Sequence, residues 1–194
     1  EVNMMDKTFC NADDATVFYD VLSEAQLAVM DTMLNTEFPW FYSDHTDSSG
    51  DGRGRFVHLF YSQNIPKSNY LNIIYPLLDK FYMHSLIRVK ANLTTKKPVG
   101  EATGGYHVDM NYLTCGICGE KECTQHLNLA KKSVTDQFTN VVYYLNSNNG
   151  YTEFEDGKKV PSVRNSMVVF SNRLRHRAVE HTDGDYQRVV LNMN

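Results

Sequence analysis

Residues 104–109 read Gly-Gly-Tyr-His-Val-Asp and end in two side chains that commonly bind metal ions, His107 and Asp109. Because successive side chains of a β-strand point to opposite faces, the single residue between them places both on one face. With a histidine from a distant strand they would form a set of two histidines and one carboxylate. Such a set holds iron from one side and leaves coordination positions open. This segment therefore predicts a metal site at the end of a strand.

The spacing His-x-Asp carries little weight alone, because seven histidines and 14 aspartates in 194 residues predict about 0.5 occurrences by chance. The sequence contains three, which are His45-Thr46-Asp47, His107-Val108-Asp109 and His181-Thr182-Asp183. No later histidine follows His181 to complete a set. His45 lies in the polar, glycine-rich segment 43–55, where no alternating strand would orient the ligands. Chain order therefore favours the second occurrence.

Short strands separated by turn residues are predicted from residue 86 onward. They span residues 86–93, 106–112, 138–145, 152–155, 166–170, 177–181 and 189–193. The turns include the run Asn-Ser-Asn-Asn-Gly at 146–150. Strands this short and evenly spaced are typical of a sandwich or jelly roll. We therefore predict an α+β, mainly β fold with a jelly-roll core over residues 86–194.

Helical patterns are confined to the first half of the sequence, which we expect to pack against that core. Ser23 and Gln26 form a capping-box pattern that predicts a helix ending near Asn35. A second helix is predicted over residues 69–84, with Pro76 in its first turns or at a kink. Residues 1–85 would thus be helices and loops, and the whole chain, 1–194, one domain.

Six motifs in this order resemble those of the Fe(II)/2-oxoglutarate-dependent dioxygenases, especially the prolyl-4-hydroxylase-like branch. They are Gly-Gly-Tyr-His-Val-Asp (104–109), Val-Val-Tyr-Tyr-Leu-Asn (141–146), Gly-Tyr-Thr-Glu-Phe (150–154), Asn-Ser-Met-Val-Val-Phe (165–170), His-Arg-Ala-Val (176–179) and Arg-Val-Val-Leu-Asn (188–192). Each motif is loose, and the specificity comes from their order. The resemblance covers residues 86–194 and implies a double-stranded β-helix, the jelly roll of this family.

The resemblance also implies the site residues and the reaction. His107, Asp109 and His176 would bind Fe(II), and Arg188 would hold the far carboxylate of 2-oxoglutarate with its guanidinium fork. Tyr106 or Tyr143 would add a hydroxyl contact to the co-substrate, and strand parity alone leaves that choice open. With O2 the site would hydroxylate a C–H bond and release succinate and CO2. The substrate would be a peptidyl proline, another side chain or a small molecule.

Two details of the resemblance bear on these assignments. In this family the anchoring base follows the second histidine by about a dozen residues, and Arg188 lies 12 residues after His176 and seven after His181. His176 is therefore preferred over His181 as the second histidine. Some relatives carry a serine two residues after the arginine, where this chain has Val190. That contact to the co-substrate is absent or replaced here.

A cysteine cluster lies between two predicted strands. Residues 115–126 contain Cys115, Cys118, Cys123 and His126 in the spacing C-x2-C-x4-C-x2-H. Four such ligands within twelve residues suit a tetrahedral structural Zn²⁺. The alternatives are incidental thiols in a glycine-rich loop or a redox-active pair. We expect an insert near the mouth of the site, where it could position substrate.

Charge divides the chain into an acidic beginning and a basic remainder. Residues 1–51 carry 11 acids and one base, although the whole chain has a net charge of only −4. Residues 158–177 hold six bases and no acid. This basic segment favours an alternative function, oxidative demethylation of nucleic-acid bases, whereas the overall acidity disfavours a nucleic-acid partner.

A second alternative to the dioxygenase is a non-catalytic jelly-roll binding module that zinc would stiffen.

No stretch approaches the roughly 18 apolar residues of a membrane span, and no basic-then-apolar leader opens the sequence. We therefore expect a cytoplasmic protein without a membrane partner.

Overall fold

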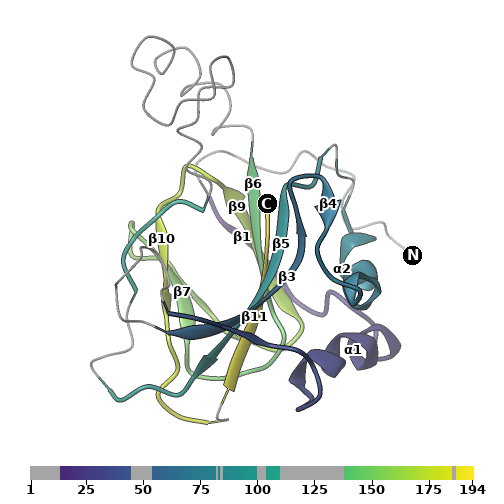
Figure 1. Cartoon of the computed structure of the whole chain (residues 1–194). Coiled ribbons are helices and arrows are strands. Elements are labelled where there is room, and N and C mark those ends of the chain that lie inside the picture. The colour runs from purple at the N-terminus through teal and green to yellow at the C-terminus, as the bar shows by residue number, and fades with distance from the viewer. Residues whose placement is uncertain are drawn as a thin grey trace.

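The computed structural model describes residues 14–44, 54–81, 83, 85–99, 104–109, 138–184 and 187–194. Among these residues, two antiparallel sheets face each other and enclose a barrel-like interior (Figure 1). The larger sheet has eight strands in the order β1-β9-β6-β11-β5-β3-β2, with β4 paired to β3. The smaller sheet has the order β10-β7-β8. This arrangement confirms the predicted mainly β, jelly-roll fold.

The larger sheet combines strands from both halves of the chain. Its members are β1 (Thr16–Phe18), β2 (Phe41–Ser43), β3 (Arg55–Ser62), β4 (Ile65–Pro66), β5 (Arg88–Thr95), β6 (Thr139–Tyr144), β9 (Ser166–Ser171) and β11 (Gln187–Met193). The smaller sheet consists of β7 (Tyr151–Phe154), β8 (Lys159–Pro161) and β10 (His176–Val179). The chain therefore crosses repeatedly between the sheets, as a jelly roll requires.

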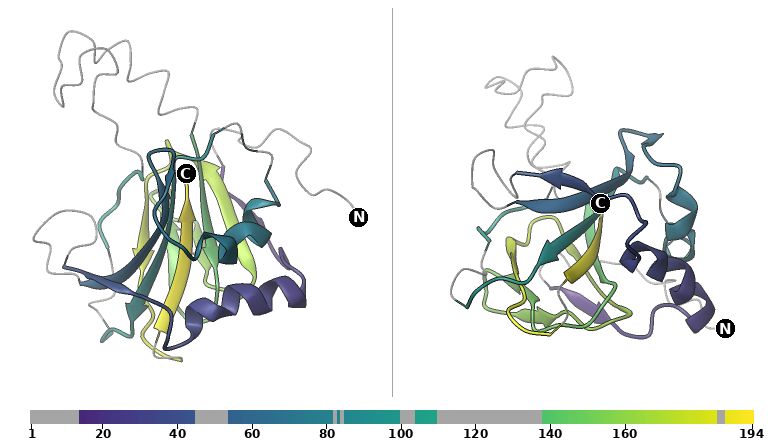
Figure 2. Two further views of the ribbon diagram at one scale, coloured as in Figure 1. Left: turned by 45° about the vertical axis from the view of Figure 1, so that its right-hand side comes forward. Right: turned by 60° about the horizontal axis from the view of Figure 1, so that its bottom comes forward.

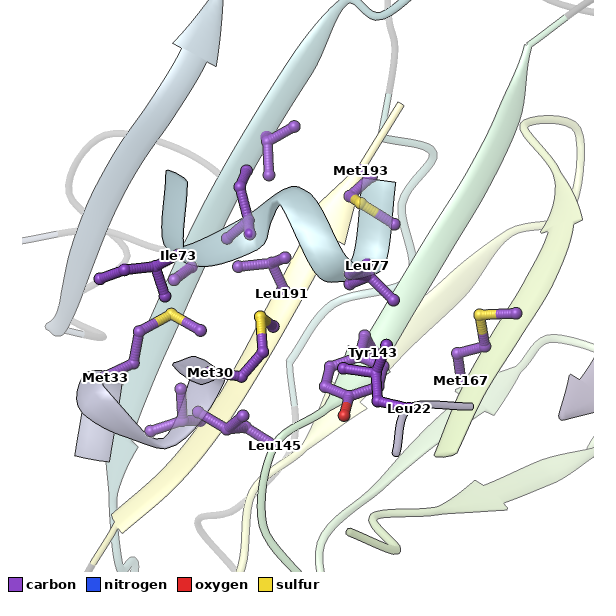
Figure 3. Packing of buried hydrophobic residues seen from close by; sticks show 14 of the residues in the cluster. Leu22, Met30, Met33, Ile73, Leu77, Tyr143, Leu145, Met167, Leu191 and Met193 are labelled. Carbon is purple, nitrogen blue, oxygen red and sulfur yellow. The ribbon is translucent and has the colours of Figure 1, made fainter. Parts of the chain in front are cut away.

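The two faces of the larger sheet bury different sets of residues. The inward face meets the smaller sheet through a compact cluster that includes Tyr144, Phe154 and Phe170. The outward face packs under helices α1 and α2 (Figure 2), and Figure 3 shows the side chains that meet there. Successive residues of β6 and β11 belong alternately to the two clusters, because strand side chains point alternately to the two faces. The helices thus cover the outside of the barrel and leave its interior to the inward-facing side chains.

Helix α1 (Glu24–Met30) begins as the sequence predicts. Ser23 is its N-cap, and the reciprocal bonds of a capping box with Gln26 are both present. Leu27 and Met30 are buried against the larger sheet. The 3₁₀ helix η1 (Asp31–Leu34) continues the helix to Asn35, which confirms the predicted end.

The prediction of a helix over residues 69–84 is wrong in length. The structure has the 3₁₀ helix η2 (Leu71–Ile74) followed by the four-residue helix α2 (Tyr75–Leu78), with Pro76 in its first turn. Proline has no N–H to donate, and its ring clashes with the carbonyl oxygen four residues earlier, so an α-helix cannot run through it from residue 69. The apolar side is nevertheless as expected, since Ile74 and Leu77 are fully buried.

Four strands in the first half of the chain, β1 to β4, are absent from the sequence-based prediction. Strand β3 is the longest of them and lies beside β5, 26 residues or more further along the chain. It joins β4 through a two-residue turn in which Gln63 and Asn64 both have positive φ, 55° and 59°. That turn type matches the twist of a hairpin. Residues 1–85 therefore contribute strands to the core and do not form helices and loops alone.

The predicted strands of the second half correspond to β5, β6, β7, β9, β10 and β11, within two residues at most ends. Strand β8 was not predicted. The expected strand over residues 106–112 reduces, within the described part, to one bridge between His107 and His176. The described helices include none long and apolar enough to cross a membrane.

Candidate active site

A backbone bridge brings the two halves of the predicted metal site together. The His107 N–H donates to the His176 carbonyl oxygen at 2.9 Å, and the His176 N–H donates back at 3.0 Å. His176 also begins β10, where it pairs with Phe154 of β7. Two histidines 69 positions apart are therefore fixed side by side at one end of the smaller sheet, with ring centroids 4.8 Å apart.

The ligand atoms of His107, Asp109 and His176 all lie within 4.8 Å of one another. Asp109 Oδ1 is 3.7 Å from His107 Nε2 and 3.8 Å from His176 Nε2. The ligand atoms of His107 and Asp109, which are separated by one residue, thus lie beside that of His176. Two histidines and one carboxylate this close together could hold a metal ion.

The second ring nitrogen of each histidine is held by the backbone. His107 Nδ1 donates to the Gly105 carbonyl oxygen at 3.0 Å, and His176 Nδ1 donates to the Leu174 carbonyl oxygen at 3.1 Å. A proton on Nδ1 leaves the lone pair of Nε2 free to bind metal. Both histidines are thus set in the tautomer that a metal site needs.

The side chain of Asp109 is only 6% exposed, and polar groups surround it. Asn194 Nδ2 donates to its Oδ2 at 3.2 Å, and Arg88 Nη2 lies 4.0 Å from its Oδ1. Burial by itself raises the pKa of this carboxyl group, but the contacts with His107 and His176 and the charge of Arg88 outweigh burial and hold the pKa well below its ordinary value. The carboxylate is therefore ionised and available as a ligand.

Aromatic rings shield the buried side of the triad. His176 packs against Phe170 and Phe154, with ring centroids 4.7 Å and 6.1 Å away. Its side chain is 5% exposed, against 32% for His107. One side of the site is thus apolar and dry, while the His107 side opens toward solvent.

Arg188 lies on the inward face of β11, in the same interior, and is 2% exposed. Its Nε donates to Ser162 Oγ at 2.9 Å, and its Nη1 lies 3.9 Å from Glu180 Oε2. The guanidinium stands 5.9 Å from the centre of the Tyr144 ring. A buried guanidinium of this kind is suited to a carboxylate group.

Several inward polar atoms along β5 and β11 have no hydrogen-bond partner among the described residues. They include Asn92 Oδ1 and Thr94 Oγ1 on β5 and Asn192 Oδ1 on β11. Thr94 is the β-sheet partner of Arg188, and Asn92 is that of Val190 two residues on. Buried polar atoms are normally hydrogen-bonded, so unpaired ones lining one interior indicate a place for a polar ligand.

The structure does not bring the two predicted tyrosines to Arg188. Tyr143 points outward from β6 into the cluster beneath the helices (Figure 3), where its hydroxyl donates to Asn165 Oδ1 at 3.1 Å. Tyr106 lies over the Arg177 guanidinium, 4.4 Å from it. Arg177 follows His176 on β10 and so points to the opposite face. The tyrosine that shares the interior with Arg188 is Tyr144.

The sequence did not single out Tyr144, because alternation along β6 does not show whether its even- or odd-numbered side chains point into the barrel. Its hydroxyl donates to Thr152 Oγ1 at 2.7 Å, and burial raises its pKa to about 12. The hydroxyl therefore keeps its proton at physiological pH. Asn194 was missed as well, since no motif marks it. The only sequence signal was that Asn194, just after the last strand, is an even number of residues from Arg188.

The other sequence-predicted ligands lie elsewhere or outside the described residues. Within the described part, the group of ligand atoms contains His176 and not His181, which agrees with the spacing to Arg188. His45 and Asp47 of the competing motif lie outside the described residues. So do all four members of the proposed zinc cluster, Cys115, Cys118, Cys123 and His126.

Comparison with solved structures places this fold among known ones. A 2OG-Fe(II) oxygenase family oxidoreductase from Burkholderia pseudomallei matches 92% of this chain and 83% of its own, at 16% identity and a TM-score of 0.59. The viral collagen prolyl hydroxylase of Paramecium Bursaria Chlorella virus-1 matches 96% and 97% at 13% identity and a TM-score of 0.54. A Trichoplax adhaerens prolyl hydroxylase, solved with a hypoxia inducible factor peptide, matches 94% and 83% at 10% identity and a TM-score of 0.56. This is the fold of the 2OG-Fe(II) oxygenases.

No protein-family model and no curated protein matches the sequence. At identities of 10–16% the likeness lies in the three-dimensional arrangement. In the 2OG-Fe(II) oxygenase fold of this chain, the triad lies at one end of the interior and Arg188 on its inner wall. A shared fold does not fix a function, so the function must be argued from these side chains.

Proposed function

We propose that this protein is an Fe(II)- and 2-oxoglutarate-dependent dioxygenase that hydroxylates a C–H bond. The observation that supports this most is the convergence of His107, Asp109 and His176 within 4.8 Å, inside a barrel that also contains a buried arginine. The structural neighbours support it further, because they are oxidoreductases of the same fold.

The residues present fit Fe(II). Two imidazole nitrogens and one carboxylate oxygen lie within 4.8 Å of one another, and both histidines have their Nδ1 bound to backbone carbonyls. Imidazole and carboxylate together suit non-haem Fe(II), and three protein ligands leave positions for other groups. In this proposal His107 Nε2, Asp109 Oδ1 and His176 Nε2 hold the metal.

The interior also fits 2-oxoglutarate. Arg188 would bind the carboxylate far from the metal, and the unpaired Thr94 hydroxyl lies beside it on the neighbouring strand. Tyr144 and Thr152 form part of the same wall. Once bound, iron and 2-oxoglutarate supply the oxidation: 2-oxoglutarate and O2 give succinate and CO2, and one oxygen atom of O2 enters the C–H bond.

The protein's own part is to bind, orient and exclude water. The backbone bonds to His107 and His176 fix the directions of their Nε2 lone pairs before metal binds. Phe170 and Phe154 keep water from the buried side of His176. A dry, pre-oriented site favours oxidation of the bound substrate over side reactions.

For the substrate we propose a peptide side chain, with a small molecule as the alternative. Two of the structural neighbours support the peptide, one a collagen prolyl hydroxylase and the other a prolyl hydroxylase solved with a peptide. The exposed side of His107 gives the site an opening through which a chain segment could approach.

Ion pairing argues against a nucleic-acid substrate. Of the six bases between residues 158 and 177, five have an acidic partner among the described residues, namely Lys158, Lys159, Arg164, Arg175 and Arg177. Two of these partners, Asp14 and Asp31, come from the acidic first part of the chain. A basic surface whose charges are already paired gains little by binding phosphates.

The test adds Fe(II) and then 2-oxoglutarate to the protein without oxygen. We expect the weak visible absorption of a metal-bound 2-oxo acid, and succinate after oxygen is admitted. His107→Ala should abolish both signals. His45→Ala, from the competing His-x-Asp motif, is the matched control and should change neither.

Two results would contradict the proposal. If the wild-type protein bound no Fe(II), or if His107→Ala bound it unchanged, the metal assignment would be wrong. If iron and 2-oxoglutarate bound but no succinate formed with any peptide or small molecule, a non-catalytic binding module would be the better description.

A further inference from the structure

Arg188 has an acidic neighbour in the interior. Glu180, the first residue after β10, places its Oε2 3.9 Å from Arg188 Nη1. The Arg188 side chain is buried, at 3% exposure, and that of Glu180 is 14% exposed. The distance is too long for a hydrogen bond but short for two opposite charges in a protein interior.

The contact is incomplete on the glutamate side. Glu180 Oε2 has no hydrogen-bond partner among the described residues. On the arginine side, Ser162 Oγ accepts from Nε at 2.9 Å and so holds the guanidinium in position. Gly150 lies close to the same side chain, since a Cβ added there would be 3.0 Å from Arg188 Cδ. Arg188 is therefore held near Glu180 without pairing fully with it.

The consequence for an incoming carboxylate is electrostatic. A carboxylate bound to Arg188 would lie within about 6 Å of Glu180, and like charges at that separation repel strongly where the effective dielectric constant is about 20. Glu180 also cancels part of the attraction of the guanidinium. The anion site is thus weaker than a buried arginine alone would make it.

The following inference rests on the proposed function. We propose that the Glu180 carboxylate and the distal carboxylate of 2-oxoglutarate both interact with the Arg188 guanidinium, and that Glu180 thereby lowers the affinity of the protein for its co-substrate. The unpaired Oε2 would also accept a hydrogen bond from a neutral distal group that carries a donor. The pocket therefore discriminates weakly between a carboxylate and an amide at that position.

The experiment measures binding directly, so it does not depend on turnover. Protein loaded with Mn(II), which is redox-silent here, is titrated by calorimetry with 2-oxoglutarate and separately with its 5-amide. Glu180→Gln should bind 2-oxoglutarate at least about tenfold more tightly than wild type. It should bind the 5-amide with an affinity changed by less than about threefold.

Glu155→Gln is the matched control. Glu155 pairs with Arg175 at 3.2 Å, and both side chains are more than half exposed. The substitution removes the same charge outside the interior, so 2-oxoglutarate binding should be unchanged. Wild type itself should prefer 2-oxoglutarate over the 5-amide by less than about tenfold, a measurement that needs no variant to fold.

The outcomes separate this inference from the proposed function. If Arg188→Ala weakens 2-oxoglutarate binding and Glu180→Gln leaves it at the wild-type value, the role of Glu180 is overturned and the co-substrate assignment stands. If Arg188→Ala has no effect, the co-substrate assignment itself fails. A wild-type preference of a hundredfold or more for the carboxylate over the amide would also overturn the role of Glu180.

Discussion

Asn194 donates a hydrogen bond from its side-chain Nδ2 to Asp109 Oδ2 at 3.2 Å. The same amide nitrogen donates to Asn140 Oδ1 at 2.9 Å, and Asn140 in turn donates to Asn172 at 3.1 Å. A row of buried amides thus leads from the end of the larger sheet to the carboxylate of the proposed metal site. Partners of this kind orient a metal ligand without touching the metal.

Asn194→Ala should weaken Fe(II) binding by roughly 10- to 100-fold, because Asp109 loses the bond that orients it. Metal affinity can be measured by competition with a chelator at neutral pH. Asn172→Ala is the control, since it removes the far end of the row and leaves the contact with Asp109 intact. It should lower the free energy of unfolding but spare metal affinity. Equal metal affinities in Asn194→Ala and wild type would show that Asp109 needs no such support.

The two neighbouring tyrosines of β6 should separate binding from stability. Tyr144→Phe removes the hydroxyl that bonds Thr152 in the interior, and we expect the KM for 2-oxoglutarate to rise several-fold. Tyr143→Phe removes a bond to Asn165 beneath the helices. It should lower the free energy of unfolding by about 1 kcal/mol and leave that KM unchanged. The opposite pattern would mean that β6 presents the other face to the co-substrate.

Gly150→Ala should impair the co-substrate pocket and spare the metal site. The new Cβ would lie 2.8 Å from Asn148 Oδ1 and 3.0 Å from both Arg188 Cδ and the Val179 carbonyl oxygen, so the surroundings of the arginine must give way. We expect several-fold weaker 2-oxoglutarate binding with unchanged Fe(II) affinity, both measured by titration. Unchanged binding of 2-oxoglutarate would place its anchor away from Arg188.

His58 should make stability depend on pH. It is 3% exposed, and burial lowers its pKa, although the hydrogen bond with the Pro39 carbonyl oxygen partly opposes this. The unfolded chain therefore binds more protons at this position, so the free energy of unfolding should fall as the pH drops below about 6.5. Denaturant unfolding at pH 7.5 and 5.5 measures the effect. His58→Gln should show a smaller fall than wild type, and equal falls would exclude His58 as the cause.

Much of the fold could be predicted because its signals are local. The capping box at Ser23 and the alternating segments after residue 86 depend on neighbours within a few positions, and the structure has α1, β5 to β7 and β9 to β11 close to those places. Where local patterns compete, prediction failed. In place of the helix expected over residues 69–84 the structure has η2 and the four-residue α2, with Pro76 in the first turn of α2, and β3 becomes a strand by pairing with β5.

The amino-acid sequence alone predicted the jelly-roll class, because strand and turn signals are local. Its resemblance to the Fe(II)/2-oxoglutarate-dependent dioxygenases singled out His107, Asp109, His176 and Arg188 as the site residues that we propose. Only the tertiary structure decided that Tyr144 and not Tyr143 faces inward. Alternation along a strand sorts its side chains into two faces, but which face points into the barrel depends on how the sheet packs. The same holds for Asn194 beside Asp109 and Glu180 beside Arg188. Asn194 and Asp109 are 85 positions apart, and only the register of β11 and the bridge at His107 bring them into contact.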